Sequence, residues 1–250
     1  MRHRDQTDGR GNRPVRVMSA PVVETHSLAK TYGLSPVLRE VELRLMPGAG
    51  AFVIGGNGAG KSTLLRILAG LEAPSDGYAL IFGQDTRKLA ARYRRRIGVM
   101  AHQSFLYPNL TARENLQFYG ELYSLADPRA SAELWLERVG LADVADSRVR
   151  TFSRGMEQRL SAARAMLPEP ALLLLDEPFA SLDHDGVDII ASLIRGAIEH
   201  GASVIATAHA IPEIEGVDFA AYEISRGRLQ PHLHKEEVRR GGRIRSLLGR

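Results

Sequence analysis

One glycine-rich stretch decides the fold: Gly55-Gly56-Asn57-Gly58-Ala59-Gly60-Lys61-Ser62. It matches the pattern G-x-x-x-x-G-K-S/T of a phosphate-binding loop, or P-loop. The apolar run Ala51-Phe52-Val53-Ile54 before it predicts a central strand, and a helix is predicted to follow from Lys61 to about Ala69. Because the motif requires a strand before it and a helix after it, these flanks favour a P-loop over a chance glycine-rich turn.

The P-loop predicts the first part of a nucleotide site. Its glycines allow backbone N–H groups to point at phosphate oxygens, and the following helix adds its positive N-terminal end. We expect Lys61 to reach the β- and γ-phosphates of ATP, and the Ser62 hydroxyl to bind Mg²⁺. The residues predicted to hold the nucleotide here are Gly55, Asn57, Gly58, Ala59, Gly60, Lys61, Ser62 and Thr63.

A second motif supplies carboxylates. The apolar run Leu172–Leu175 predicts a buried strand that leads into Asp176 and Glu177. A carboxylate at the end of such a strand can bind Mg²⁺, directly or through water, so Asp176 is expected to be a metal ligand. Glu177 is then placed to polarise an attacking water. An isolated acidic pair after a strand could simply cap the end of that strand. Because Asp176 and Glu177 follow a P-loop in the sequence, the catalytic interpretation is favoured.

The remaining pattern predicts an α/β protein. Strands are expected at residues 22–28, 40–45 and 203–207, and helices at about 155–166 and 185–199. Strands that alternate with helices predict a mostly parallel sheet covered on both faces.

A helical insert is expected at about residues 104–155. Thr111 and Glu114 form a capping-box pattern for a helix that runs to about Leu125. Asp127-Pro128 provides the start of a second helix that runs to Val139. This segment therefore interrupts the alternation of strands and helices.

The composition is that of a globular protein. The 250 residues (27.4 kDa) are 44% hydrophobic and 25% charged. No apolar run approaches the roughly 18 residues that indicate a membrane helix. We expect no signal peptide, because the first twenty residues are polar and basic and lack an apolar h-region. Cysteine is absent, which excludes disulfides, thiolate metal sites and a cysteine nucleophile. We expect a cytoplasmic location because no signal peptide is found.

Arginines gather at the two ends of the chain, and the net charge is +4. We expect a flexible basic extension at residues 1–20, one ATPase-like domain at 21–230 and a basic tail at 231–250. Solvated, frayed ends are the expected state, and contact with nucleic acid or anionic lipid is the alternative. Met18 is an alternative start of the chain.

A third motif, Phe152-Ser153-Arg154-Gly155-Met156, precedes a predicted helix, with Ser153 as a natural N-cap. In this order, the motifs resemble the ATP-binding subunit of an ABC transporter over about residues 20–230. The resemblance implies a RecA-like P-loop NTPase core with a mostly parallel sheet, an N-terminal antiparallel β portion and an inserted all-helical subdomain. Ser153 and Gly155 match the family signature L-S-G-G-Q, whereas the other three positions depart from it.

The same resemblance implies roles for single residues. Gln103 matches the Q-loop glutamine that senses Mg²⁺ and the γ-phosphate, and Tyr32 matches the aromatic residue that stacks on adenine. His209 matches the switch histidine, and Asp183 belongs to the D-loop match Ser181-Leu182-Asp183. The implied catalytic residues are Glu177, His209 and Lys61; the implied metal ligands are Ser62, Gln103 and Asp176.

The resemblance also implies partners. Ser153 and Gly155 are implied to contact ATP held by the P-loop of a second copy, so that two ATP molecules lie in a head-to-tail homodimer. With one P-loop and no hydrophobic span, the chain is expected to join integral membrane permease subunits at the cytoplasmic face of the cell membrane. Neither nucleic acid nor haem is expected to bind the chain directly. DNA-repair and translation-factor relatives are disfavoured, because their long coiled coil or second nucleotide-binding half is absent.

Three short stretches bear on the cargo. They resemble the ATP-binding subunit of the haem exporter of cytochrome c biogenesis. The three stretches are His102-Gln103, the Phe179 that follows Asp176-Glu177-Pro178, and Leu182-Asp183-His184-Asp185-Gly186. Haem export is therefore the expected function. An ABC-2-type exporter of drugs or lipids is the alternative, and a non-transport nucleotide-binding protein is a remote one.

Overall fold

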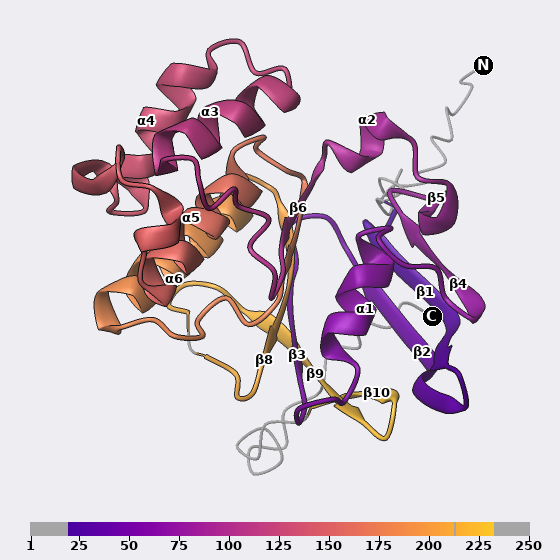
Figure 1. Cartoon of the computed structure of the whole chain (residues 1–250). Coiled ribbons are helices and arrows are strands. Elements are labelled where there is room, and N and C mark those ends of the chain that lie inside the picture. Colours follow the sequence, from indigo (N-terminus) through magenta and orange to yellow (C-terminus); the bar gives the residue numbers. More distant parts are fainter. Residues whose placement is uncertain (1–19, 213, 233–250) are drawn as a thin grey trace, which may run out of the picture.

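The computed structural model describes residues 20–212 and 214–232. The predicted basic extension and tail lie almost entirely outside these residues. The described part contains a six-stranded sheet in the order β10-β9-β3-β8-β7-β6 and a four-stranded sheet in the order β2-β1-β4-β5 (Figure 1). Helices lie on both sides of the six-stranded sheet, which stands almost edge-on in this view.

The six-stranded sheet is mostly parallel, as predicted. Every neighbouring pair runs parallel except the β9–β10 hairpin. The predicted strand at Ala51–Ile54 is internal to this sheet, and all its residues are buried. The six strands are β3 (Gly50–Ile54), β6 (Ile97–Met100), β7 (Leu172–Leu175), β8 (Ser203–Ala208), β9 (Phe219–Ser225) and β10 (Arg228–Pro231).

The four-stranded sheet is antiparallel and N-terminal, which confirms the expected antiparallel β portion. From Glu40 to Leu45 exposed and buried residues alternate strictly, as the sequence pattern requires of a half-exposed strand. Its first strand extends to Tyr32, beyond the predicted end. The strands are β1 (Val23–Tyr32), β2 (Ser35–Leu45), β4 (Asp76–Ile81) and β5 (Gln84–Asp85).

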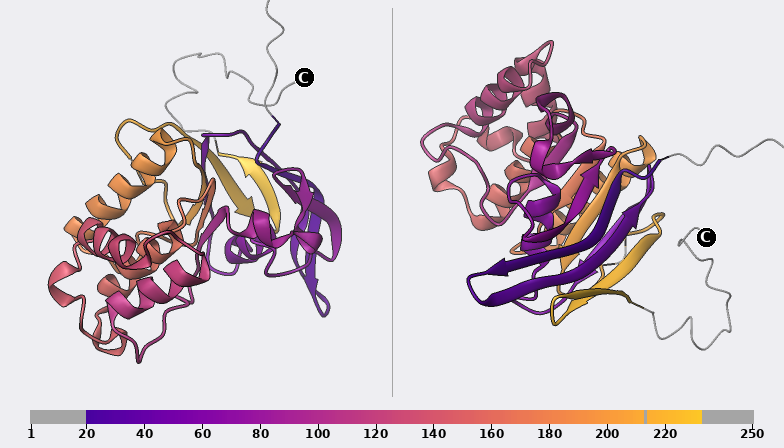
Figure 2. Two further views of the ribbon diagram at one scale, coloured as in Figure 1. Left: turned by 90° about the horizontal axis from the view of Figure 1, so that it is seen from above. Right: turned by 90° about the vertical axis from the view of Figure 1, so that its right-hand side faces the viewer.

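Successive residues of β7 contribute to two different hydrophobic clusters. Leu172 and Leu174 pack with α1 (Lys61–Leu68) and the antiparallel sheet, whereas Leu173 and Leu175 pack on the side of α5 (Arg154–Met166) and α6 (His184–Glu199). Side chains on a strand alternate between faces, so a continuous apolar run is what a strand covered on both faces requires. Figure 2 shows the pink and orange helices on one side of the parallel strands and the indigo antiparallel strands on the other, which is also the side of α1.

Helices occupy the segment between β6 and β7. The capping box of Thr111 and Glu114 is formed at the start of α3 (Ala112–Leu122), and Asp127 caps α4 (Pro128–Arg138). α3 ends at Leu122, three residues before the predicted end at Leu125. Ser124 has a φ of 59°, a left-handed conformation that an α-helix cannot contain. The remaining helical elements are α2 (Ala91–Arg94) and short 3₁₀ turns at Thr86–Lys88, Ala142–Val144 and Val149–Thr151.

No helix among the described residues is long and apolar enough to cross a membrane.

Candidate nucleotide-binding site

The predicted P-loop links the end of β3 to the start of α1. Two of its glycines cannot be replaced without conflict. Gly60 has a φ of 109°, and a Cβ there would lie 2.8 Å from the Leu38 side chain. A Cβ on Gly55 would lie 2.7 Å from the carbonyl oxygen of Ile224. The loop therefore follows a path that only glycine permits at these two positions. The Ala59 N–H donates to Gly56 O (3.2 Å) within the loop, and the loop ends at the N-terminus of α1, where backbone N–H groups can face an anionic ligand.

Lys61 is buried at the first position of α1. Its side chain is 6% exposed, and Nζ donates to the carbonyl oxygens of Gly55 (2.8 Å) and Gly56 (3.4 Å). The same Nζ lies 3.4 Å from Glu177 Oε1, which belongs to the second motif. Next to it, Ser62 is exposed and Thr63 is half-buried. The structure thus brings the predicted P-loop lysine and the predicted water-polarising carboxylate together.

Glu177 is the meeting point of the predicted catalytic residues. Its Oε1 lies 3.2 Å from His209 Nε2 as well as 3.4 Å from Lys61 Nζ. Glu177 also has a φ of 50°, a left-handed backbone conformation that directs the chain sharply away from β7. His209 follows β8, which pairs with β7, so the two side chains meet at the carboxyl end of neighbouring strands.

Asp176 is buried and receives a hydrogen bond that the sequence analysis did not foresee. Thr207 Oγ1 donates to Asp176 Oδ1 (2.6 Å) and accepts from the Glu177 backbone N–H (2.9 Å). A threonine near the carboxyl end of β8, after the apolar run Val204-Ile205-Ala206, is the signal that was available. Thr207 bonds only one of the two carboxylate oxygens, Oδ1. Asp176 therefore keeps lone pairs, on Oδ2 in particular, for a further partner.

Gln158 is a second residue that the sequence analysis missed. Its side-chain amide on α5 donates to the carbonyl oxygens of Glu177 (3.0 Å) and Pro178 (3.3 Å). These bonds hold the turn after β7 against the helix that carries the signature match. The predicted site residue Gln103 lies three residues beyond Met100, the last residue of β6. The Asp176 N–H donates to Met100 O (2.7 Å), so the ends of β6 and β7 that lead to Gln103 and Asp176 are adjacent.

The residues present suit a magnesium ion bound together with nucleotide phosphates. Ser62, Gln103 and Asp176 offer a hydroxyl, an amide oxygen and a carboxylate, which are the oxygen ligands that Mg²⁺ takes. Within residues 20–212 and 214–232, no group of three or more histidine, cysteine, aspartate or glutamate side chains can hold a metal alone. An ion at this site would therefore depend on substrate oxygens as well.

Tyr32 is the last residue of β1, and its side chain lies close to Thr63 in the first turn of α1 and to Glu72, which follows that helix. Lys30 Nζ lies 5.0 Å from its ring centre and 3.0 Å from Glu72 Oε1. Burial and a hydrogen bond to Glu72 raise the pKa of Tyr32. Burial acts to raise the pKa of Glu72, but hydrogen bonds from Tyr32 and Lys30 outweigh it and hold that pKa below its ordinary value. This polar cluster fixes an exposed tyrosine ring near Thr63, where the resemblance places adenine.

The signature and D-loop matches form a separate recess. Ser153 caps α5 and Asp183 caps α6, so both side chains also have local structural roles. A Cβ on Gly155 would lie 3.2 Å from Ser181 O, which explains the small residue at this position. The recess includes no P-loop residue, and its lining is Ser153, Arg154, Gly155, Met156, Arg159, Ser181 and Asp183.

Comparison with known proteins identifies relatives of the whole arrangement. A family model described as ABC transporter matches residues 38–180. The linearmycin resistance ATP-binding protein LnrL of Bacillus subtilis (strain 168) is 34% identical, over 78% of this chain and 63% of the relative. The ABC transporter ATP-binding protein NatA of the same strain is 36% identical, over 72% of this chain and 74% of the relative. The bacitracin transport ATP-binding protein BcrA of Bacillus licheniformis is 34% identical, over 89% of this chain and 72% of the relative.

Solved structures agree with the sequence relatives. A dimeric structure of the ATP-binding cassette MJ0796 bound to ADP and Pi superposes with a TM-score of 0.77 at 26% identity, covering 85% of this chain and 99% of that chain. A structure described as the ATP-binding subunit of an ABC transporter superposes with a TM-score of 0.78 at 28% identity, covering 88% and 92%. The family model covers more than half of the chain, and relatives above 30% identity extend over most of it. This chain belongs to the ABC transporter family.

Proposed function

We propose that this chain is the ATP-binding and ATP-hydrolysing subunit of an ABC-2-type exporter of drug-like or lipid-like molecules. The observation that carries the ATPase proposal is the position of Glu177 Oε1, 3.4 Å from the P-loop lysine and 3.2 Å from His209. This places a candidate base, a cation and a candidate phosphate-sensing histidine at the same edge of the parallel sheet. Phosphoryl transfer depends mainly on such positioning and charge stabilisation.

In this mechanism each residue has a distinct task. The P-loop N–H groups and Lys61 neutralise phosphate charge, Glu177 orients and deprotonates the attacking water, and His209 steadies the terminal phosphate. Ser62, Gln103 and Asp176 would hold a magnesium ion, which would supply further positive charge beside the phosphates. Thr207 and Gln158 hold the backbone and carboxylate of this segment in place through the hydrogen bonds described above.

The test of the hydrolytic role is Glu177→Gln, which removes the base but keeps the shape of the side chain. We expect ATP binding to persist and ATP turnover to fall by about 100-fold or more, because general base catalysis contributes factors of this order. Glu199→Gln, at the exposed end of α6, is the matched control and should hydrolyse ATP at the parental rate. Full turnover in Glu177→Gln would contradict the assignment.

We propose that ATP closes a head-to-tail dimer in which the recess around Ser153 and Asp183 faces the P-loop of the second copy. The physical separation of this recess from the P-loop within one chain supports the proposal. Arg154, which stands where the family signature has glycine, is exposed at this recess. Glu177→Gln with ATP should elute from a sizing column as a dimer, and a monomer with bound ATP would contradict the sandwich.

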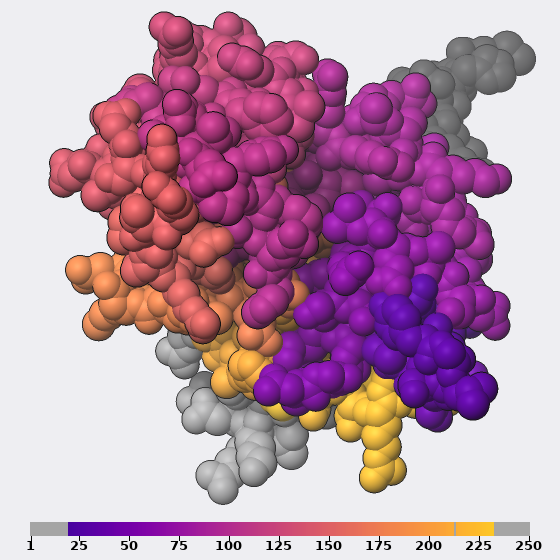
Figure 3. Space-filling model, viewed as in Figure 1, coloured from indigo at the N-terminus to yellow at the C-terminus, as the bar shows by residue number. Residues whose placement is uncertain are grey.

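We propose that the helical part docks integral membrane permease subunits, which hold the chain at the cytoplasmic face of the membrane. Three large apolar side chains beyond the Q-loop match are exposed: Tyr107 (46%), Phe118 (39%) and Leu122 (60%). Tyr107 and Phe118 pack edge to face at 5.0 Å, and we call these three residues the aromatic surface. Figure 3 shows the helical part and the P-loop part as two masses with a hollow between them near the top of the view. Replacing all three by alanine should abolish co-purification with the permease, and retained co-purification would move the docking site elsewhere.

The relatives support a drug or lipid cargo. The names of curated relatives include linearmycin resistance, bacitracin transport, Nod factor export and daunorubicin resistance. These names favour the ABC-2-type alternative over the haem export that the short motifs predicted.

Haem export remains a second candidate on one specific observation. His102 and Gln103, the dipeptide that resembles the haem exporter subunit, are both exposed. A haem stain of membrane c-type cytochromes in a strain carrying Glu177→Gln separates the two cargo proposals. Normal covalently bound haem would exclude haem export. Loss of that haem, restored by the unaltered chain, would exclude the drug or lipid proposal as the main role.

A further inference from the structure

Four arginines lie within five residues on α2 and at its C-terminal end: Arg92, Arg94, Arg95 and Arg96. All four are exposed, and we call them the α2 arginine patch. From residue 82 to residue 110 the sequence contains a single carboxylate, Asp85, and that side chain is already paired with Arg87. The local chain therefore leaves the patch without a counter-charge.

The contacts of the patch are with rings and a carbonyl group. Arg92 lies 4.9 Å from the Tyr93 ring centre and Arg96 lies 4.3 Å from the Phe82 ring centre. Arg94 Nε donates to Leu89 O (3.0 Å). Within the described part of the chain, no carboxylate forms an ion pair with any of the four. Their charges are thus available to an external anion.

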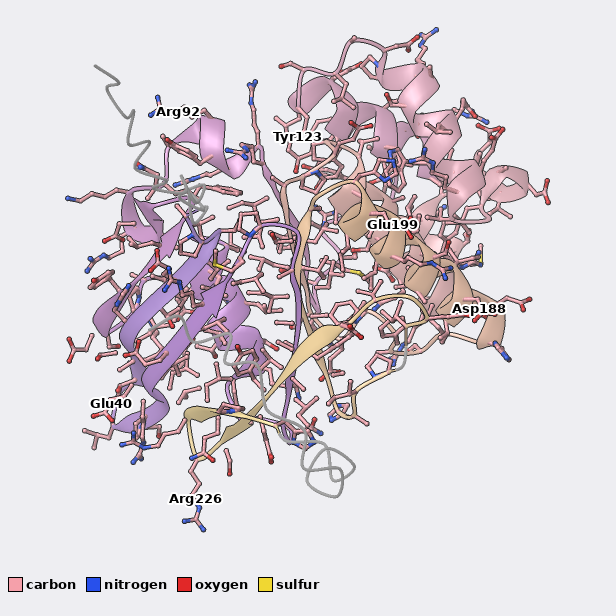
Figure 4. All side chains as sticks on the ribbon, turned by 180° about the vertical axis from the view of Figure 1, so that it is seen from behind. Glu40, Arg92, Tyr123, Asp188, Glu199 and Arg226 are labelled. Carbon is pink, nitrogen blue, oxygen red and sulfur yellow. The ribbon has the colours of Figure 1, made fainter. Side chains whose placement is uncertain are left out.

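The patch and the aromatic surface lie at the same end of the molecule. Figure 1 places α2 and α3 both in the upper part of the view, on either side of β6. Figure 4 places the labelled Arg92 and Tyr123 at one end of the molecule and Arg226 at the other. Tyrosines beside arginines at one end of a protein are typical of a surface that meets the membrane–water interface. Clusters of four or more basic residues near a membrane attract anionic lipids.

We propose that the α2 arginine patch binds the phosphate groups of anionic phospholipids in the membrane that holds the permease. Guanidinium groups pair bidentately with phosphate, which gives this contact geometry as well as charge. The inference rests on the proposed function, because docking to a permease brings this end of the molecule to the lipid surface. It adds a direct lipid contact that acts beside the aromatic surface.

The ring contacts favour lipid over nucleic acid as the partner. Proteins that bind single-stranded nucleic acid present open aromatic faces on which bases stack. Here, Arg92 and Arg96 already lie over Tyr93 and Phe82. The two rings also stack against each other at 6.4 Å. Headgroup phosphates need no free ring, so the observed packing suits them.

The test uses the full purified chain and vesicles of phosphatidylcholine with or without phosphatidylglycerol. The patch variant carries Arg92→Gln, Arg94→Gln and Arg95→Gln, and it keeps Arg96, whose guanidinium packs over the Phe82 ring at 4.3 Å. The control removes three exposed arginines around the β9–β10 turn through Arg39→Gln, Arg226→Gln and Arg228→Gln. Arg39 adjoins this turn because its N–H donates to Gly227 O (2.8 Å), and Figure 4 labels Arg226 at the end of the molecule opposite Arg92. Thermal unfolding and ATP turnover establish that each variant is folded.

The parental chain should sediment with phosphatidylglycerol vesicles at low salt and be released at high salt. The patch variant should bind these vesicles about 100-fold more weakly, since each basic residue near an anionic surface contributes about fivefold, while the control should bind like the parent. An equal loss in patch variant and control, or unchanged binding in the patch variant, would overturn the proposal. If the patch variant still binds the vesicles but loses binding to RNA, the patch is assigned to RNA instead. If it still binds the vesicles but no longer co-purifies with the permease in lipid-free detergent, the patch is assigned to the permease. The vesicles contain no permease, so this result is independent of the Glu177→Gln outcome.

Discussion

Thr207 and Asp176 share a buried hydrogen bond that organises the hydrolytic end of the site. Thr207 Oγ1 donates to Asp176 Oδ1 over 2.6 Å, and the same oxygen accepts from the Glu177 backbone N–H over 2.9 Å. Thr207 is completely buried and Asp176 is 8% exposed. A buried carboxylate needs such a partner, and here one hydroxyl on β8 sets the positions of two consecutive acidic residues after β7.

Replacing the Thr207 hydroxyl should separate the contribution of its hydrogen bonds from that of side-chain packing. Thr207→Val keeps the volume of the side chain but leaves the Asp176 carboxylate and the Glu177 N–H without their partner. We expect unfolding free energy to fall by about 1–3 kcal/mol. ATP turnover should fall at least about tenfold, since Glu177 loses its fixed backbone position. Urea unfolding and a phosphate-release assay measure the two effects. Thr207→Ser retains the hydroxyl and should recover most of the turnover; equal losses in both variants would contradict the role of the hydrogen bond.

Removal of the P-loop cation should affect binding as well as turnover. Lys61→Ala deletes the ammonium group that lies 2.8 Å from Gly55 O and 3.4 Å from Glu177 Oε1. We expect no measurable ATP hydrolysis and weaker binding of a fluorescent ATP analogue, because phosphate charge is no longer compensated. Lys88→Ala, an exposed lysine in a 3₁₀ turn, is the control and should hydrolyse ATP normally. Parental turnover in Lys61→Ala would refute the P-loop assignment.

Two glycines should respond in opposite directions to alanine. A Cβ on Gly98 in β6 would lie 2.2 Å from the backbone carbonyl oxygen of Ala165 on α5, so Gly98→Ala should destabilise the protein by about 1–3 kcal/mol through overpacking. Gly196 lies inside α6 with nothing within 4 Å of an added Cβ, so Gly196→Ala should stabilise by about 0.5–1 kcal/mol. Thermal unfolding of the two variants gives the sign of each change, and a stable Gly98→Ala would show that α5 can move away from β6.

The cluster below Tyr32 should make stability depend on pH. Because the pKa of Glu72 is held below its ordinary value of 4.5, the ionised carboxylate stabilises the fold above about pH 4.5, and this stabilisation is lost as pH falls through the lower folded-state pKa. Glu72→Gln should therefore be less stable than the parent near neutral pH and equal to it in acid. Urea unfolding across this range tests the sign. Glu121→Gln, at an exposed position of α3, is measured beside it as the comparison variant. A stability difference between Glu72→Gln and the parent that is the same at every pH would contradict the ion-pair origin.

The helix starts and the phosphate loop could be predicted because they depend on residues close together in the chain. Thr111 with Glu114, and Asp127 with the N–H of Ala130, satisfy backbone groups within one turn of helix. The P-loop likewise consists of consecutive residues whose conformation requires glycine.

The strands that the sequence analysis missed depend on distant partners. β6 has only four residues, one of them Gly98, and it becomes a strand through its parallel register with β7. The β9–β10 hairpin attaches to the sheet through the pairing of β9 with β3. Local pattern is weak in such short segments, because parallel pairing is decided by chain segments far apart in sequence.

The sequence by itself determined which residue types are present for chemistry: a P-loop lysine, an acidic pair after a buried strand, and a histidine after another strand. Only the tertiary structure decided which of them meet. Glu177 contacts Lys61 and His209, and it is held by Thr207 and Gln158, residues 30 and 19 positions away along the chain. The physical reason is that parallel strands bring their carboxyl ends to one edge of the sheet, where side chains distant in sequence come within hydrogen-bonding distance.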